Sequence, residues 1–266
     1  MKHKEKYSKK DVAFVLCCVV FLLMNIGAIG SGGRRRAKDI ICLSNLHQWG
    51  KMFELFTNNN DGYFMEGFTS NNRWIRALGA YHKYDTNFSC CPEATKPWFD
   101  LYGNSTDSTI GGAFMAWGYY MQSVWIKPMK GSYGINGWVN NPDPGREPSG
   151  RPAEYHWRTP NVKEAANVPL FLGCQRYNAW PRHTDTPPDF DGQMLLGLEQ
   201  MMRVCVNRHN GTVSHLFTDW SARKIGLKQS WTLKWHRKFN TNGPWTKAGG
   251  VQPSDWPEWM TNFKDF

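Results

Sequence analysis

The stretch RRAKDIICLSNLHQWGKMFELFTNNNDG, residues 35–62, decides the first element of the fold. Its large apolar side chains recur at alternating steps of four and three, at Cys42, Leu46, Trp49, Phe53 and Phe56. This spacing places them on one stripe of a helix, with the polar residues between them turned elsewhere. Asn and Gly tolerate the left-handed conformation that ends helices, so the run at 58–62 predicts the stop. The sequence predicts an amphipathic helix over 35–57 whose stripe is buried against another element.

Upstream of this helix lies an apolar run. Residues 12–29 contain no charge and a single amide, Asn25, and 18 residues are just enough for a helix to cross a bilayer core. The run is apolar all round, unlike a buried core helix, which has a polar face. We therefore expect a transmembrane helix over 12–30, preceded by a cytoplasmic basic segment over 1–11.

A cleaved signal peptide is the alternative for this region. It would use the basic start, the apolar run and a small-x-small exit at Ala28-Ile29-Gly30. Basic residues flank the run on both sides, so the positive-inside rule does not decide its orientation. Either interpretation exports residues 31–266 if the amino terminus stays in the cytoplasm, and a retained anchor is favoured.

The net charge does not point to nucleic acid. The formal charge of +10 is concentrated at the start, where residues 1–40 hold nine Lys or Arg against three acids. Residues 41–266 hold 23 against 19, so the remaining domain is only mildly basic. A nucleic-acid binder is expected to carry a basic patch on its folded domain. Charge beside a membrane segment explains this pattern better.

The rest of the chain predicts a small sheet. Residues 203–207, the Asn210-Gly211 pair and residues 212–218 read as a β-hairpin, because Asn-Gly supplies the positive φ angles of a tight turn. A further strand over 222–227 extends it to a β-meander over 203–227. The tail over 231–266 is rich in Trp, Pro and Gly and is expected to wrap onto the sheet. The predicted fold class is α+β, with one long helix packed on a small antiparallel sheet.

The cysteines do not form a zinc motif in the sequence. Cys17 and Cys18 lie in the apolar run, and five others follow at Cys42, Cys90, Cys91, Cys174 and Cys205. No C-x-x-C pair suggests zinc, although an exported domain permits disulfides. Because five is odd, at least one thiol is expected to stay free or to pair between chains.

Several short motifs together resemble a known family. They are Cys42-Leu43-Ser44-Asn45-Leu46-His47-Gln48-Trp49-Gly50, Asn60-Asp61-Gly62-Tyr63-Phe64, Phe88-Ser89-Cys90-Cys91-Pro92-Glu93-Ala94 and Ser132-Tyr133-Gly134-Ile135-Asn136. Near the end, His209 and Asp219 are separated like the processing-associated signature of a histidine, nine residues and Asp-Gly. The set is similar to prepilin-type proteins abundant in planctomycetes and related bacteria, and it covers residues 7–230.

The resemblance implies a pilin-like fold and a non-enzymatic role. It predicts a pseudopilin-like component of a type II secretion or type IV pilus-like cell-envelope system, with other pilin-like subunits or secretion-system proteins as partners. The expected location is the bacterial cytoplasmic (inner) membrane, spanned once, with the C-terminal domain exported to the periplasm or cell surface. No catalytic residue and no cofactor are predicted.

The sequence departs from the family pattern in two ways. Asp11 takes the place of the glutamate that helps pilins assemble, and Lys6 replaces the Gly at which prepilins are cut. Trp220 replaces the Gly of the Asp-Gly pair. The first departure argues against cleavage and against ordinary polymerisation, with Asp11 as a shorter stand-in for the glutamate.

The family-motif residues are expected to be structural: Cys42, Asn45, Asp61, Gly62, Cys91, Pro92, His209 and Asp219. His209 and Asp219 invite a catalytic dyad, but the hairpin places them at opposite ends of one strand. Cys42 and Cys91 both fall in motifs that match the family, which makes them a candidate disulfide.

The sequence gives little support for a calcium-binding loop or for a catalytic pair of carboxylates. Counting back from Gly62 gives Thr57, Asn59 and Asp61 as calcium ligands but Phe68 where an EF-hand needs Glu. Calcium at another loop stays open because some pseudopilins bind it, with no ligands named. The acidic residues Asp185, Asp189, Asp191 and Glu199 could supply a glycosidase pair, but acids in a Pro-rich segment are usually solvated.

The fourteen tryptophans give an alternative function. Exposed Trp side chains stack on sugar rings, so a cell-surface or secreted carbohydrate-binding module is the second hypothesis. Aromatic side chains that fill a core poor in Leu and Ile explain the same composition, and this explanation is favoured.

Overall fold

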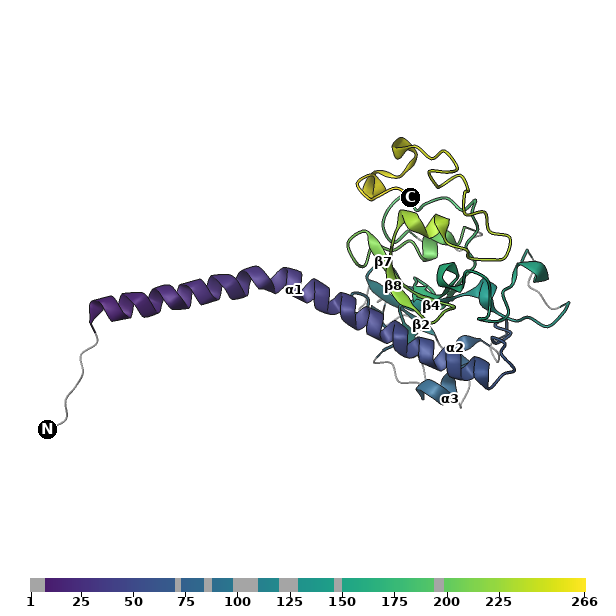
Figure 1. Ribbon diagram of the computed structural model, residues 1–266, viewed down its shortest axis with the longest axis horizontal. Helices are drawn as coiled ribbons and strands as arrows, with labels where there is room; N and C mark the ends of the chain where they lie inside the picture. The colour runs from purple at the N-terminus through teal and green to yellow at the C-terminus, as the bar shows by residue number, and fades with distance from the viewer. Residues whose placement is uncertain are drawn as a thin grey trace, which may run out of the picture. The chain divides into compact units, whose positions relative to one another are not determined.

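The computed structural model describes residues 8–69, 73–83, 88–97, 110–119, 129–145, 150–193 and 199–266. The chain divides into two compact units, Met1–Ile40 and Ile41–Phe266. Their boundary falls inside one helix, α1 (Lys9–Asn58), and each unit is treated by itself (Figure 1). Residues 1–7, which carry most of the predicted basic segment and Lys6, lie outside the described residues.

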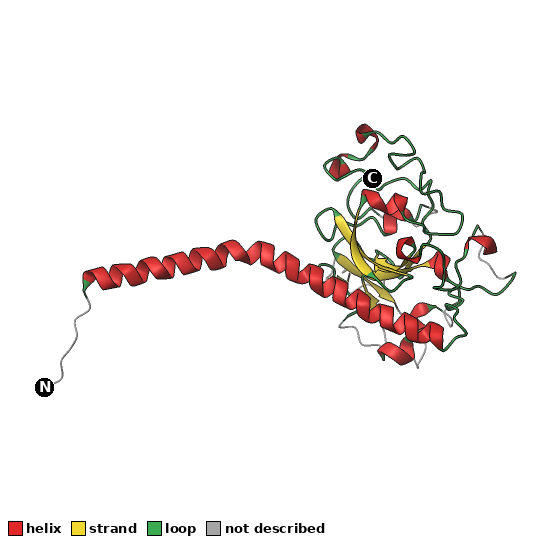
Figure 2. Ribbon diagram, in the orientation of Figure 1, coloured by secondary structure: helices red, strands yellow, loops and turns green. Residues whose placement is uncertain are grey.

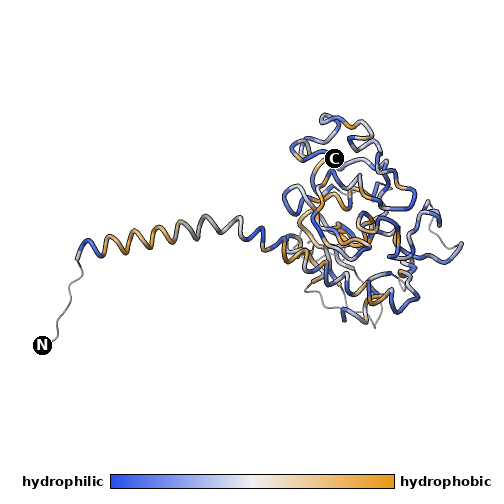
Figure 3. Tube along the Cα trace, in the orientation of Figure 1, coloured by the Kyte–Doolittle hydropathy of each residue, from blue (hydrophilic) through white to orange (hydrophobic). Residues whose placement is uncertain are grey.

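The first unit contains the start of α1. The Ser8 main-chain N–H donates to the Asp11 carboxylate at 3.0 Å, and the Ser8 hydroxyl accepts from the main-chain N–H of Lys10 at 3.2 Å. These two bonds cap the orphan donors of the first turn. The apolar side chains that follow are 45% to 70% exposed, at Val12, Phe14, Val15, Leu16, Val19, Val20, Phe21, Leu22 and Met24. Figure 3 shows this stretch as the apolar start of the helix.

The structure contradicts the predicted transmembrane helix over 12–30. Among the residues that the structure describes, no helix is both long and apolar enough to cross a bilayer. A crossing needs about 20 consecutive apolar residues in one helix. The classification as a membrane protein depended on this helix, and so did the single-pass location in an inner membrane. Both predictions are corrected with it.

In the second unit the stripe of α1 is buried as its spacing predicts. Cys42, Leu46, Trp49 and Phe53 are each at most 1% exposed. The helix ends where the Asn-Gly run predicts it, because Asp61 and Gly62 adopt φ angles of 51° and 80°. The main-chain N–H of Gly62 then reaches back to the carbonyl of Thr57 at 2.9 Å and satisfies one of the last carbonyls of the helix.

The sheet of the second unit has five strands in the order β6-β4-β5-β7-β8. Their bounds are β4 (Tyr133–Asn136), β5 (Pro169–Gly173), β6 (Asn178–Ala179), β7 (Thr212–Phe217) and β8 (Ala222–Gly226). The sheet is mixed rather than antiparallel, because the edge strand β6 pairs in parallel with β4. The α+β class is confirmed.

Smaller elements surround this sheet. A second sheet has the order β1-β2-β3, formed by β1 (Lys96–Pro97), β2 (Met115–Tyr119) and β3 (Met129–Gly131). Two short helices follow α1, namely α2 (Trp74–Ala77) and α3 (Gly79–His82). The 3-10 turns are Gly137–Val139, Ala153–Tyr155, Ala165–Asn167, Met201–Arg203, Lys228–Thr232, Pro253–Asp255 and Glu258–Met260.

The predicted meander over 203–227 is correct only in its second half. β7 and β8 pair antiparallel, with Val213 opposite Ile225. Residues 203–207 are not a strand, since a 3-10 turn over Met201–Arg203 precedes the Asn210-Gly211 turn. β7 instead takes β5 as its other neighbour, with Leu172 opposite His215. A pairing partner 40 residues upstream cannot be found from local turn chemistry.

The five-stranded sheet carries a different layer on each face (Figure 2). On the helix face, Phe171, Leu216 and Ile135 pack with the buried stripe of α1. On the tail face, Leu172, Val213 and Phe217 pack with Trp231, Trp235 and Trp256 of the C-terminal segment. Neighbours such as Phe171 and Leu172 belong to opposite faces because strand side chains alternate. The expected wrapping of the tail onto the sheet is confirmed.

A buried Cys2His cluster as the candidate site

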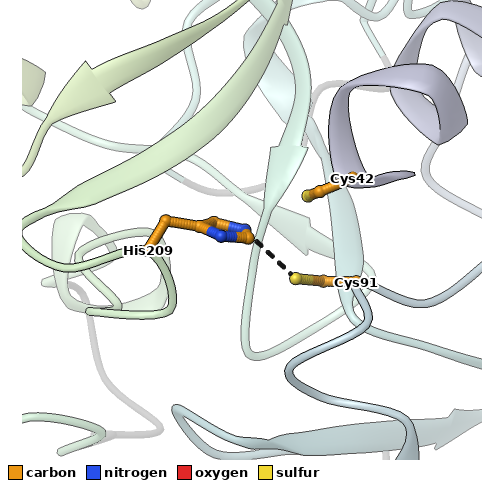
Figure 4. A group of neighbouring side chains, drawn as sticks. All are labelled: Cys42, Cys91 and His209. Carbon is orange, nitrogen blue, oxygen red and sulfur yellow. Dashed lines mark hydrogen bonds between the residues drawn. The ribbon is translucent and has the colours of Figure 1, made fainter. Parts of the chain in front are cut away.

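Three side chains that can hold a metal meet on the helix face. They are Cys42 of α1, Cys91 of the loop over residues 88–95, and His209 of the turn before β7 (Figure 4). Their ligand atoms all lie within 4.8 Å of one another, and Cys91 Sγ is 3.2 Å from His209 Nε2. Within the described ranges, no other group of His, Cys, Asp and Glu side chains converges in this way.

Cys42 reaches the site because it begins the buried stripe of α1. Its thiol is 1% exposed and accepts a hydrogen bond from the Tyr133 hydroxyl at 3.2 Å. Tyr133 is the first residue of β4 and is itself fully buried. The contact therefore ties the helix to the sheet at the edge of the cluster.

Cys91 is positioned by hydrogen bonds to the main chain of its own loop. The Asn45 side-chain amide donates to the carbonyl of Cys90 at 3.1 Å, and the Trp49 indole donates to that of Phe88 at 3.1 Å. The main-chain N–H of Cys91 donates to the Ser132 hydroxyl at 2.6 Å. Since Asn45 and Trp49 lie on α1, the helix that carries Cys42 also holds the loop that carries Cys91.

Pro92 gives this loop its bend. The main-chain N–H of Ala94 donates to the carbonyl of Cys91 at 2.8 Å, which closes a turn with Pro92 at its second position. Proline fits that position because its ring fixes φ near −65°. Both predicted motif residues of this loop, Cys91 and Pro92, thus have a structural role.

His209 is held by the residues on either side of it. The Thr212 hydroxyl donates to its carbonyl at 2.7 Å, and Asn210 and Gly211 follow with φ angles of 53° and 79°. Arg208 is 4% exposed, and its guanidinium donates to the main-chain carbonyls of Gly112, Ala113, Ser132 and Cys174. These bonds fix the chain just before the histidine and place a buried positive charge near the thiols.

The two thiols are not equivalent. The hydrogen bond from Cys91 lowers the pKa of Cys42 well below its ordinary value, and His209 adds to this effect while burial opposes it. The same hydrogen bond, together with burial and the charge of Cys42, raises the pKa of Cys91. Burial, followed by Cys42 and Cys91, raises the pKa of Tyr133. Of the two thiols, Cys42 is therefore the one whose ionised form is favoured by its surroundings.

Ser214 completes the polar surroundings of the cluster. Its hydroxyl is buried, has no hydrogen-bond partner within the described residues, and lies close enough to Cys42 to lower the pKa of that thiol. Ser214 alternates on β7 with Val213 of the tail face, so strand geometry directs it to the helix face. A buried hydroxyl without a partner is uncommon and calls for an explanation.

The remaining motif residues lie elsewhere. Asp219 is exposed in the turn between β7 and β8, where it accepts from the main-chain N–H and the hydroxyl of Ser221. The length of β7 keeps it about 20 Å from His209, so the two do not form a dyad. Asp61 and Gly62 end α1, and Asp11 caps its start. Calcium binding stays a prediction without ligands.

The four candidate acids are held by local hydrogen bonds. Asp185 is buried and accepts from the main-chain N–H groups of Arg182, Gln200 and Met201 at 2.9 to 3.0 Å. Burial raises its pKa to about 6 in spite of these bonds. The other three acids also accept local hydrogen bonds, Asp189 from Gln193, Asp191 from Asn207 and Glu199 from Thr186. Each of the four thus has a local structural partner.

The tryptophans fill the interior. Trp49, Trp74, Trp117, Trp138, Trp231 and Trp235 are each at most 2% exposed, and no Trp of the described residues is classed as exposed. A sugar-stacking platform needs an accessible ring face. Carbohydrate binding stays a prediction, and the described tryptophans are buried or partly buried rather than exposed.

Sequence reasoning found three of the residues at this cluster and missed three. Cys42, Cys91 and His209 were named from motifs, but only Cys42 and Cys91 were expected to meet. Tyr133, Arg208 and Ser214 were not named as site residues. Tyr133 and Arg208 lie in or beside the quoted motifs, which is a usable signal. Ser214 has none, because only the pairing of β7 in the sheet directs its hydroxyl toward Cys42.

The cluster offers two thiol sulfurs and one imidazole nitrogen in an enclosed place. Such a donor set can bind a thiophilic cation or, after oxidation, hold a disulfide. All three ligand residues are buried, and a pocket of about 360 Å³ lies apart from them, between the end of α1 and residues 141–143. Comparison of the chain with protein-family models, with characterised proteins and with solved structures gave no match, so the resemblance to prepilin-type proteins stays a prediction that rests on its motifs.

Proposed function

We propose that this chain is a non-enzymatic, pilin-like structural subunit of a secretion or pilus-type assembly. The observation that carries the proposal is the contrast along α1. Its second part packs its stripe into the sheet domain, whereas the large apolar side chains described in its first part, over residues 12–22 and at Met24, are exposed.

The exposed stretch has the properties of a helix that packs among several others. Consecutive residues such as Phe14, Val15 and Leu16 are 70%, 59% and 58% exposed, so apolar side chains surround the helix. A helix that is apolar all round needs cover on every side, which one flat surface does not give. The same stretch of other copies supplies such cover with a single sequence, as in symmetric homo-oligomers. The motifs that resemble prepilin-type proteins agree with this role.

Two native cysteines make the proposal testable. Cys17 and Cys18 are both free and exposed within the apolar stretch. The full chain would be expressed in bacterial cells and treated with a mild thiol oxidant. We expect a ladder of disulfide-linked multimers on non-reducing gels, because packed copies bring these thiols together.

Matched variants locate the contact. The double variant Cys17→Ser, Cys18→Ser is expected to lose the ladder, while Cys205→Ser keeps it because that thiol is buried in the second unit. Val15→Asp is expected to weaken the ladder, since it places a charge among apolar side chains. A chain whose Cys17 and Cys18 react with maleimide but never cross-link is a monomer, and that result removes the proposal.

A further inference from the structure

The cluster of Cys42, Cys91 and His209 brings together residues from three separate parts of the chain. The separation between Cys91 and His209 is 118 residues, so no local turn requires them to meet. They are 1%, 0% and 6% exposed and lie against the apolar helix face. Burying three reactive polar groups together is costly unless they satisfy one another or a shared ligand.

Their chemistry selects one class of ligand. Two thiol sulfurs and an imidazole nitrogen match structural zinc sites, whereas calcium and magnesium require oxygen ligands. Zinc bond lengths of about 2.3 Å to sulfur and 2.0 to 2.1 Å to nitrogen place tetrahedral ligand atoms roughly 3.5 to 3.8 Å apart. The three atoms here lie within 4.8 Å of one another, with Cys91 Sγ and His209 Nε2 at 3.2 Å. Small side-chain movements reach the required spacing.

We propose that Cys42, Cys91 and His209 bind a zinc-class cation that joins α1, the loop over residues 88–95 and the turn before β7. Binding releases the thiol protons to solvent, and the two thiolates then neutralise the charge of the divalent ion in the buried site. The Tyr133 hydroxyl donates to Cys42 Sγ at 3.2 Å and orients this thiolate. The Ser214 hydroxyl, which is buried on the helix face without a hydrogen-bond partner among the described residues, provides for the fourth position directly or through a water.

A disulfide between Cys42 and Cys91 is the competing use of the same thiols. It would leave His209 Nε2 beside a sulfur that carries no proton and would not engage Ser214. A metal ion engages all of these groups at once, which favours the cation. The inference is independent of the proposed assembly role, since the exposed stretch over residues 12–24 contains none of these residues.

The test uses the full chain, prepared under reducing conditions and freed of metal by a chelator. One equivalent of Zn²⁺ is added, excess ion is removed by gel filtration, and bound zinc is measured by mass spectrometry. We expect about one zinc ion per chain and a rise of several degrees in the melting temperature, since a ligand of the native state stabilises it. With Co²⁺ as the probe, thiolate-to-metal charge-transfer absorption is expected.

Variants then assign the ligands. Cys42→Ser and Cys91→Ser are expected to abolish retained zinc, and His209→Gln to weaken the affinity at least about tenfold. Cys174→Ser is the matched control, because it removes a buried thiol outside the cluster. The cobalt spectrum of the unaltered chain needs no variant and stays informative if a substitution impairs folding.

Two results would overturn the inference. One is a reduced, folded chain that retains no zinc and gives no thiolate band with cobalt. The other is a Cys42–Cys91 disulfide found by non-reducing peptide mapping of the protein isolated with its thiols blocked. Neither result affects the cross-linking of Cys17 and Cys18, so the two proposals fail separately.

Discussion

The two faces of the five-stranded sheet are both buried, but different kinds of chain cover them. The helix face is covered by a regular stripe of α1 and holds the cluster of Cys42, Cys91 and His209. The tail face is covered by irregular chain rich in Trp, and it buries isolated ionisable groups such as His215, His236 and Asp185. The comparison teaches that a regular helix stripe can bring several polar groups together at one place, whereas an irregular cover satisfies each polar group locally.

The largest expected effect comes from removing one indole on each face. Trp49 and Trp235 are both fully buried, and Trp235 also donates to the carbonyl of Ser230 at 2.8 Å. We expect Trp49→Ala and Trp235→Ala each to lower the free energy of unfolding by about 3 to 5 kcal/mol. Urea denaturation measures both, with Tyr63→Ala, at a 43% exposed site, as the control of small effect. A negligible loss for Trp235→Ala would mean that the tail is not part of the core.

Acid is expected to destabilise the tail face through its histidines. Burial lowers the pKa of both His215 and His236 to about 3. Arg223 also lowers the pKa of His215, and His183 and Arg182 also lower that of His236. The unfolded chain takes up these protons near pH 6.5, so stability is lost as the pH falls from 6.5 toward 3. The loss is about 3 kcal/mol per histidine by pH 4.

The variant His215→Gln isolates this effect. It should flatten the dependence of the urea midpoint on pH between 7 and 4.5, because glutamine does not titrate. His47→Gln, on the exposed side of α1, serves as the control. An unchanged slope in His215→Gln would show that this histidine has the same pKa in the folded chain as in the unfolded chain.

Asp185 should act in the opposite direction with a smaller effect. Burial raises its pKa to about 6, so between pH 6 and pH 4 the folded chain binds its proton more tightly than the unfolded chain does. This group alone makes the protein more stable as the pH falls through that window, by about 2 kcal/mol. Asp185→Asn removes the contribution and should steepen the acid loss measured by thermal unfolding. The exposed Asp219→Asn is its control, and equal slopes in the two variants would contradict the assignment.

Much of the helix face was predictable from the sequence because it depends on one period. The steps of four and three from Cys42 to Phe56 predict the stripe, and Asp61 and Gly62 predict its end. The prediction of a membrane-spanning segment was wrong, since no helix among the described residues is both long and apolar enough to cross a bilayer. The first strand of the meander was also wrong, because β7 pairs with β5 rather than with residues 203–207.

The cluster, too, was predictable from the sequence only in part. Sequence motifs pointed to Cys42, Cys91 and His209 individually. The sequence predicted a disulfide between the two cysteines and grouped His209 with Asp219, so it did not predict that all three would meet. Asn45 and Trp49 bring the Cys91 loop to α1, and the main-chain acceptors of Arg208 fix the turn that carries His209. These contacts join residues up to 96 positions apart, and no local propensity records them.

The sequence by itself determined the long helix, its buried stripe, its end at the Asn-Gly run and the aromatic character of the core. These features follow from the period of the apolar residues and from backbone conformations that a few residue types prefer. Only the tertiary structure decided the strand order, the separation of the two faces and the meeting of two thiols with an imidazole. Those depend on long-range packing, in which each contact is made possible by others distant in the sequence.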